Sequence, residues 1–220
     1  MPPPTATASA RRRPSRSAAV ARRKAAARRR RRAIMAVIAG AAVVVLVVMA
    51  LPLAKRAVND LGLPLDYSSV IRQQAAQKHL DPALVAAVIY AETKFDARTS
   101  PAGAEGLMQL MPQTATFLAH KSGATTFTTA DLSTPQVNIA YGSYYLRYLL
   151  NEFHGNVIEA LAAYNGGEAN VHTWIATARA GGQPFRIDDI PFPETRDYVQ
   201  RVLQARGEYR RTYPGQLGYD

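Results

Sequence analysis

The sequence predicts an all-α domain that follows one membrane-spanning helix and a disordered basic tail. Three observations lead to this prediction. Residues 1–32 are rich in arginine and poor in large apolar side chains, and residues 33–54 carry no charge. The remaining sequence repeats helix-start signals and shows no strand-like alternation of apolar and polar residues.

The positive charge of the chain is concentrated in its first 32 residues. They contain twelve of the 27 Lys and Arg and no acidic residue, which leaves fifteen basic against sixteen acidic residues for the rest. A segment with so few large apolar side chains cannot offset its ordering entropy by burial, so we expect disorder. Arginine runs also bind nucleic acid, but beside an apolar run we favour contact with anionic lipid headgroups and expect no nucleic-acid partner.

Residues 33–54 form an uncharged run of 22 residues. As a helix, this run would span roughly 30 Å of hydrocarbon. Five arginines at 28–32 precede it and two bases, Lys55 and Arg56, follow it, which favours a cytoplasmic N-terminus and an exported remainder. The alternative is a cleaved signal peptide, because small residues such as Ala50 and Ala54 would permit cleavage and give a secreted form.

The exported part reads as helices joined by short loops. After a linker at 55–65, the domain is expected to occupy 66–213, followed by a tail at 214–220. Asp81-Pro82 and Thr134-Pro135 are start signals, and Asn165-Gly166-Gly167 is a stop signal. The expected helices are 66 or 68 to 78, 82–93, 112–121, 135–153, 157–165, 168–180 and 193–213.

Glu92 is an acid on the apolar side of the second expected helix. Leu84, Val88 and Glu92 lie four residues apart, with Val85 and Ile89 on the same stripe. A desolvated carboxyl has a raised pKa, which suits a general acid. The alternative from the residues alone is a frayed helix end, with Glu92 turned to solvent or paired with Lys94 or Arg98.

The loop after Glu92 contains Gly103 and Gly106, and Gln109 interrupts the apolar run that follows. The glycines permit tight turns, or a close approach of the main chain to a polar ligand. Gln109 is a candidate ligand contact, but a glutamine in an apolar run also serves as a local hydrogen bonder.

Four segments in order resemble the lytic transglycosylase domain of the soluble type (SLT), glycoside hydrolase family 23. They are AETKF at 91–95, SPAGAEGLMQLMP at 100–112, AAYNGG at 162–167 and IPFPETRDYV at 190–199. Three positions depart from the family pattern: Thr93 replaces a serine, the loop from Glu92 to Pro101 is one residue shorter, and Ala169 stands at a common glycine.

The resemblance implies a lysozyme-like fold and cleavage of the β-1,4 bond between N-acetylmuramic acid and N-acetylglucosamine. Glu92 would act alone, first as acid and then as base toward the muramyl C6 hydroxyl, with formation of a 1,6-anhydro end. Peptidoglycan strands are the implied substrate, and no cofactor is implied. The implied substrate-binding residues are Gly106, Leu107, Met108, Gln109, Tyr164, Asn165, Glu194 and Tyr198.

Each supporting residue also has an ordinary structural interpretation. Tyr164 could be core packing, Asn165 a helix C-cap and Glu194 an acid that stabilises a helix start. The four histidines are scattered, so we expect no metal. Two other functions remain open: a lysozyme-type hydrolase on the same fold, and a non-catalytic wall-binding scaffold in a cell-wall synthesis or envelope complex.

Overall fold

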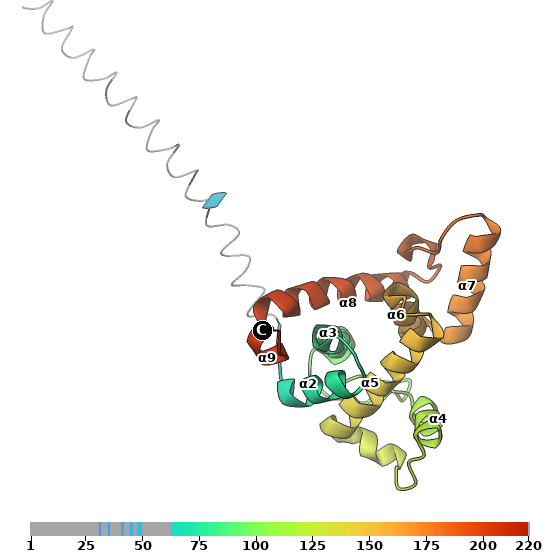
Figure 1. The fold of residues 1–220 in the computed structure, drawn as a ribbon. Coiled ribbons are helices and arrows are strands. Elements are labelled where there is room, and N and C mark those ends of the chain that lie inside the picture. The colour runs from blue at the N-terminus through green and yellow to red at the C-terminus, as the bar shows by residue number, and fades with distance from the viewer. Residues whose placement is uncertain are drawn as a thin grey trace, which may run out of the picture. The chain divides into compact units, whose positions relative to one another are not determined.

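The structure is a computed structural model that describes residues 63–219 and six isolated helical positions before them: Arg31, Met35, Ala41, Val45, Val48 and Met49 (Figure 1). The expected tail at 1–32 and most of the expected span at 33–54 therefore lie outside the described residues. In the part of the chain that is described, no helix combines the length and the apolar character needed to cross a bilayer. The chain divides into two compact units, Met1–Val58 and Asn59–Asp220, and the second holds every element below.

Helices account for the regular structure of residues 63–219. The only pairing of extended segments in that range is one isolated antiparallel bridge between Glu105 and Leu110. The α-helices are α2 (Ser68–Gln77), α3 (Pro82–Thr93), α4 (Pro112–Ser122), α5 (Pro135–Glu152), α6 (Val157–Gly166), α7 (Glu168–Ala180), α8 (Pro193–Thr212) and α9 (Pro214–Leu217). Two 3-10 helices, η1 (Thr129–Ser133) and η2 (Ile187–Asp189), lie between them.

The seven helices predicted from the sequence are confirmed, with ends that differ by one or two residues. The start signal acts as expected at α3, and Asn156 caps α6 in the same way, whereas the Thr134 side chain makes no capping hydrogen bond at α5. The Asp81 carboxylate accepts the Ala83 N–H at 3.0 Å, and the Asn156 side chain accepts the N–H groups of Ile158 and Glu159. These bonds satisfy donors that the first helical turn leaves free. The helices η1, η2 and α9 were not predicted.

The central element is α3, which lies under α8, with α2 also packed against it (Figure 1). Sequence periodicity predicts one buried face for this helix, but every residue from Ala83 to Ile89 is buried. A helix that is apolar on all sides belongs inside a domain. The buried face of α8, which includes Val199, Val202 and Tyr209, covers it. After Ala83, the next partly exposed residue of α3 is Tyr90, in its last turn.

The packed unit extends on both sides of the expected 66–213 domain. Leu63 and Leu217 are buried in the same core cluster as α3. The hydroxyl groups of Tyr209 and Tyr213 donate to the main-chain oxygens of Pro64 (2.6 Å) and Leu63 (2.7 Å). Both segments that flank 66–213 therefore contribute to the fold.

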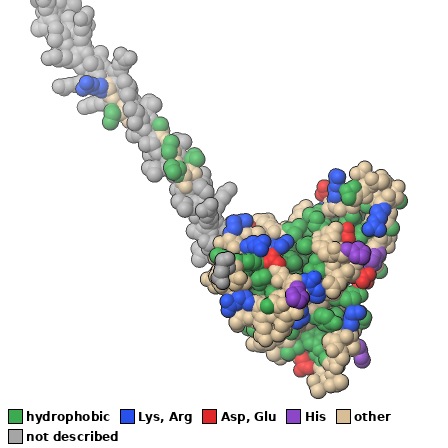
Figure 2. All heavy atoms as spheres, viewed as in Figure 1, with side chains coloured by type: hydrophobic (Ala, Val, Ile, Leu, Met, Phe, Trp, Pro, Cys, Tyr) green, Lys and Arg blue, Asp and Glu red, His purple; other side chains and the backbone are tan. Residues whose placement is uncertain are grey.

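The surface of the domain carries basic and acidic groups side by side (Figure 2). This mixture agrees with the near balance of charge in the sequence after residue 32. One ion pair has a structural role: Arg206 of α8 donates to Asp81 at 2.6 Å, and Tyr219 also contacts that carboxylate. The capping residue of α3 thus holds α8 and the C-terminal segment together.

Candidate functional site

Glu92 lies in the last turn of α3, where the buried helix reaches the surface. The first two residues after α3, Lys94 and Phe95, take positive φ angles of 54° and 66°, which turn the chain away from the helix axis. Burial raises the pKa of Glu92 to about 7, against the combined effects of Tyr198, Arg201 and Arg98, which lower it. A carboxyl with this pKa holds its proton near neutral pH.

The neighbours of the Glu92 carboxyl come mainly from α8. The Tyr198 ring is 2% exposed, and its buried hydroxyl has no hydrogen bond of ordinary geometry among the described residues. That hydroxyl nevertheless lies near enough to Glu92 to lower the pKa of the carboxyl, and the Arg201 charge acts in the same direction. Glu194, one turn earlier on α8, raises the pKa by charge repulsion.

Arg98 caps the end of α3 through main-chain oxygens. Its guanidinium donates to the oxygens of Glu92 (3.1 Å) and Thr93 (3.3 Å). Within residues 63–219, no ion pair joins the Glu92 carboxylate to Arg98 or to Lys94. The alternative interpretation of Glu92 as a solvated or ion-paired helix end is therefore not what the structure shows.

Thr93 joins the end of α3 to the glycine loop. Its side chain is buried, and its hydroxyl donates to the Leu107 main-chain oxygen at 2.8 Å, with the Ile89 oxygen at 3.2 Å. Thr93 stands where the family pattern has a serine, and it keeps the hydroxyl group that makes this hydrogen bond. The added methyl group is accommodated in the core.

The loop is closed on itself as well. Glu105 and Leu110 exchange two main-chain hydrogen bonds, of 2.9 and 3.0 Å. Gln109 has a positive φ of 47°, and its amide group donates to the oxygens of Arg98 (2.7 Å) and Gly106 (2.8 Å). Gln109 is therefore a local hydrogen bonder, one of the two interpretations that the sequence left open. Its side chain is partly exposed.

Asn138 of α5 is one residue of this site that sequence reasoning missed. It is fully buried; it accepts the Met108 N–H at 2.8 Å and donates to the oxygens of Glu105 (2.9 Å) and Leu132 (3.0 Å). Gly106, with φ of 74°, passes so close that an added Cβ would lie 2.2 Å from the Asn138 amide nitrogen. The available signal was an amide on the buried stripe of α5, in step with Gly142 and Leu146.

Leu107 and Met108 have buried side chains, so they support the loop from the core side. Met108 packs against Gly142, where an added Cβ would meet its sulfur at 2.3 Å. Its main-chain oxygen accepts the Tyr164 hydroxyl at 2.9 Å. A ligand could meet these two residues only through main-chain atoms, whereas the sequence suggested Met108 as a direct contact.

Tyr164 and Asn165, at the end of α6, point to different neighbours. Tyr164 is partly buried, and burial first and the Glu92 charge second raise its pKa well above the ordinary value. Asn165 is exposed and accepts the hydroxyl of buried Thr195 at 2.8 Å. Asn165, Thr195 and Glu194 line a surface hollow between α6 and α8, together with Gly166, Phe192 and Pro193.

The structure thus brings Glu92, Tyr164 and Tyr198 together and sets the 106–109 loop against them. Glu194 is within electrostatic reach of Glu92, and Asn165 belongs to the adjoining hollow. Asn138, Arg201 and Thr195 complete the surroundings. These three residues lie on helices that are far from Glu92 in the sequence, so residue spacing could not predict that they belong to the site.

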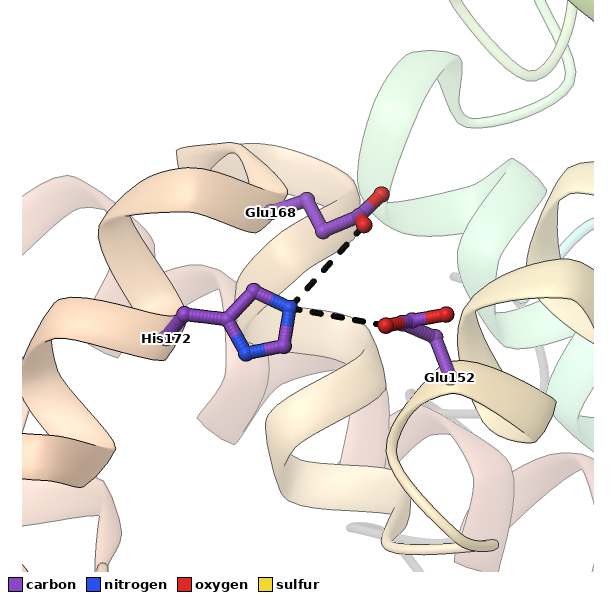
Figure 3. Close-up of side chains that lie close together, drawn as sticks. All are labelled: Glu152, Glu168 and His172. Carbon is purple, nitrogen blue, oxygen red and sulfur yellow. Dashed lines mark ion pairs between the residues drawn. The ribbon is translucent and has the colours of Figure 1, made fainter.

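One histidine lies in a cluster of possible metal ligands away from Glu92. Nε2 of His172 is 3.7 Å from Glu152 and 3.9 Å from Glu168 (Figure 3). The three ligand atoms lie within 4.8 Å of one another, and nothing in the sequence pointed to this cluster of one histidine and two glutamates. These contacts join side chains of a surface cluster, and we assign no metal to it.

The family model of the transglycosylase SLT domain matches residues 69–184, more than half of the chain. The chain belongs to the transglycosylase SLT domain family. The resemblance drawn from the four sequence segments is therefore confirmed. The matched range contains Glu92, the 106–109 loop, Asn138, Tyr164 and Asn165.

The comparisons with individual SLT proteins agree. The soluble lytic murein transglycosylase of Escherichia coli K12 is 34% identical over 151 residues, which are 67% of this chain and 23% of that protein. Other relatives are named membrane-bound lytic murein transglycosylases. The chain spans about a quarter of the length of the soluble enzymes that it matches.

Two solved structures show the same lysozyme-like fold. An inactive glutamate-to-glutamine mutant of the lytic transglycosylase Slt from Pseudomonas aeruginosa has a TM-score of 0.62 and 34% identity, covering 68% of this chain and 24% of that one. The 70 kDa soluble lytic transglycosylase of Escherichia coli has a TM-score of 0.62 and 33% identity, covering 68% of this chain and 25% of that one. It has also been solved in complex with bulgecin A.

The hydrogen bonds of Asn138 lead to a stability prediction. Asn138→Ala removes all three and leaves the buried Met108 N–H of the 106–109 loop without its partner, so we expect a loss of about 2–4 kcal/mol in the free energy of unfolding. Urea denaturation followed by circular dichroism measures it. Asn151→Ala, exposed on the same helix, is the control and should cost less than about 0.5 kcal/mol. Equal midpoints for the two variants would contradict the role given to Asn138.

Proposed function

We propose that this protein is a lytic transglycosylase that cleaves the β-1,4 bond between N-acetylmuramic acid and N-acetylglucosamine in peptidoglycan, with Glu92 as its single acid and base. The observation that carries the proposal is the pKa of about 7 of one half-buried carboxyl, set beside the family's glycine loop. Family membership and the names of the relatives support the substrate class. The inactive glutamate mutant of the Pseudomonas relative supports the importance of one carboxyl.

The reaction begins with Glu92 protonated. Its proton goes to the glycosidic oxygen, the C1–O bond breaks, and the N-acetylglucosamine part leaves with a new hydroxyl group. The Glu92 carboxylate then takes the proton of the muramyl C6 hydroxyl, and the C6 oxygen bonds to C1. The products are a 1,6-anhydromuramyl end and a 4-hydroxyl end, and Glu92 is protonated again, so no water is consumed.

The surroundings of Glu92 suit this exchange of a proton. Burial favours the protonated acid before cleavage, while Arg201 and the Tyr198 hydroxyl favour the carboxylate that exists between the two steps. These opposing effects keep the carboxyl near the pKa at which it can both give and take a proton. The other nearby acids are less suited: Asp96 is exposed, and Glu105 accepts a hydrogen bond from Thr99 at 2.9 Å.

A lysozyme-type hydrolase is the second candidate, and Glu194 is the observation that favours it. Glu194 is an exposed acid whose charge reaches Glu92, and glycosidases that use water commonly place two carboxyl groups across the sugar. The two functions differ in their products. Water as acceptor gives a reducing end, whereas the C6 hydroxyl gives an anhydro end that is lighter by one water.

Glu92→Gln should reduce cleavage of purified peptidoglycan by at least about 100-fold, the usual contribution of a positioned general acid. Mass spectrometry of the soluble muropeptides measures the rate and identifies the ends. Wild-type protein should release anhydromuramyl ends. Reducing ends in their place would show a hydrolase, and equal release by wild type and variant would remove Glu92 from the mechanism.

The pH dependence of kcat/KM should fall on the alkaline side with a midpoint near 7, because Glu92 must hold its proton to start the reaction. Tyr198 lowers the pKa of Glu92, so Tyr198→Phe should move this midpoint to higher pH. Glu194 raises that pKa, so Glu194→Gln should move the midpoint to lower pH. Shifts in the same direction for both variants would contradict the electrostatic assignment.

We further propose that residues 33–54 anchor the enzyme in the cytoplasmic membrane, with residues 1–32 on the cytoplasmic side and the SLT domain outside. The uncharged run and its flanking arginines support this arrangement. Membrane-bound relatives make it compatible with the family.

In cells that produce the whole chain, the protein should stay in the membrane pellet after alkaline carbonate extraction and should retain residues 1–54 on N-terminal sequencing. A double variant with Val44→Arg and Val45→Arg should weaken this retention, since charges at the centre of a span are costly. A soluble wild-type protein that begins near residue 55 would instead show a cleaved signal peptide.

A further inference from the structure

A row of aromatic rings leads from the candidate site across α5 to α4. Tyr164 contacts Tyr145, with ring centroids 5.1 Å apart, and Tyr145 lies 6.3 Å from Tyr148 with nearly parallel planes. Tyr148 meets Phe117 of α4 edge to face at 5.5 Å. The row begins at Tyr164, whose hydroxyl donates to the Met108 main-chain oxygen, and it ends at Phe117, three ring contacts away.

The outer rings of this row are accessible to solvent. Phe117 is 46% exposed, and Tyr145 and Tyr148 are partly exposed. A single exposed phenylalanine is ordinary on a protein surface. One exposed ring in a row with two partly exposed rings, next to a candidate site, is less ordinary, and apolar patches of this kind mark binding surfaces. Folding does not require Phe117 at this position, because its ring remains half in water.

A sugar strand has the chemistry that this row would bind. The C–H groups on the faces of a pyranose ring pack against aromatic rings, while its hydroxyl and acetamido groups stay at the edges, within reach of tyrosine hydroxyls. Peptidoglycan is a polymer, so a strand with one bond at Glu92 extends past the units on either side. Because the aromatic row starts beside Glu92, a strand bound for cleavage at Glu92 could also contact the rings of this row.

Lys121 adds a charge to this surface. Its Nζ lies 5.2 Å from the Tyr148 ring centroid and 5.8 Å from that of Phe117, and it has no ion pair within the described part of the chain. Two acids also reach this surface: the charges of Glu152 and Glu168 act on Tyr148, and the Tyr148 hydroxyl is hydrogen-bonded to Glu168. Both acids lie beside His172 (Figure 3). Lys121 is thus available for an anionic ligand, such as the carboxylates of muramic acid or of its peptide stem.

We propose that Phe117, Lys121, Tyr145 and Tyr148 form a second glycan-binding surface, which takes a carboxylate-bearing sugar unit of the same strand at a distance from the bond that is cleaved. This inference rests on the proposed function for the identity of the strand. It adds a contact that favours long strands over short ones. Phe117 and the tyrosines bind the sugar faces, and Lys121 selects units that carry a carboxylate.

Binding without cleavage tests this surface. In the Glu92→Gln background, isothermal titration calorimetry with peptidoglycan strands of several disaccharide units should give a Kd that rises by about 10-fold with Phe117→Ala. Tyr67→Ala, which changes an aromatic side chain of similar exposure at the start of α2, should leave the Kd unchanged. Unfolding midpoints of both variants should match that of the parent, since both rings are solvent-exposed.

A second ligand separates the contribution of Lys121 to binding from that of Phe117. Lys121→Ala should weaken binding of the peptidoglycan strands but not of a chitin hexasaccharide, which has no carboxylate, whereas Phe117→Ala should weaken both. Unchanged Kd values for Phe117→Ala would contradict the proposed binding surface. Equal losses of affinity for both ligands in Lys121→Ala would contradict the proposed selectivity of Lys121 for carboxylates. Because catalysis is absent from this assay, binding losses at Phe117 would stand even if the cleavage products disproved the transglycosylase mechanism.

Discussion

The burial of α3 on every side is the constraint from which the site follows. From Ala83 to Ile89 the helix has no exposed face, so its axis is held within the core and its last turn emerges at one fixed place. Glu92 is in that turn, far enough inside for desolvation to raise its pKa and close enough to the surface to meet a ligand. The covering helix α8 contributes Tyr198, Glu194 and Arg201, so one packing contact sets both the position and the charge environment of the acid.

A second set of contacts fixes the loop opposite the acid. Thr93 binds the Leu107 oxygen, Tyr164 binds the Met108 oxygen, and Asn138 binds the Met108 N–H. Polar main-chain groups of a buried loop must all find partners, and these three side chains supply them from three different helices. The loop is therefore rigid before any ligand arrives, which is what a site that must hold a reacting bond in place requires.

Two groups near the candidate site lower the stability of the fold. A carboxyl in a half-buried position and a buried tyrosine hydroxyl without an ordinary hydrogen bond both disfavour folding. Such groups are expected where a protein uses a perturbed pKa. The aromatic row from Tyr164 to Phe117 follows the same logic, since apolar rings are left in water where a strand could cover them.

The sequence by itself determined the seven longer helices and the family, and it singled out Glu92 as the candidate acid. Start signals such as Asp81-Pro82 and stop signals such as Asn165-Gly166-Gly167 act within a few residues, so they can be read without the fold. Four short segments were also enough to identify the family and to single out Glu92. Only the tertiary structure decided how α3 is buried, that Leu107 and Met108 face the core, and that Asn138 holds the loop. Those facts depend on contacts between helices far apart in the chain, and no local pattern encodes which distant side chain will supply a partner.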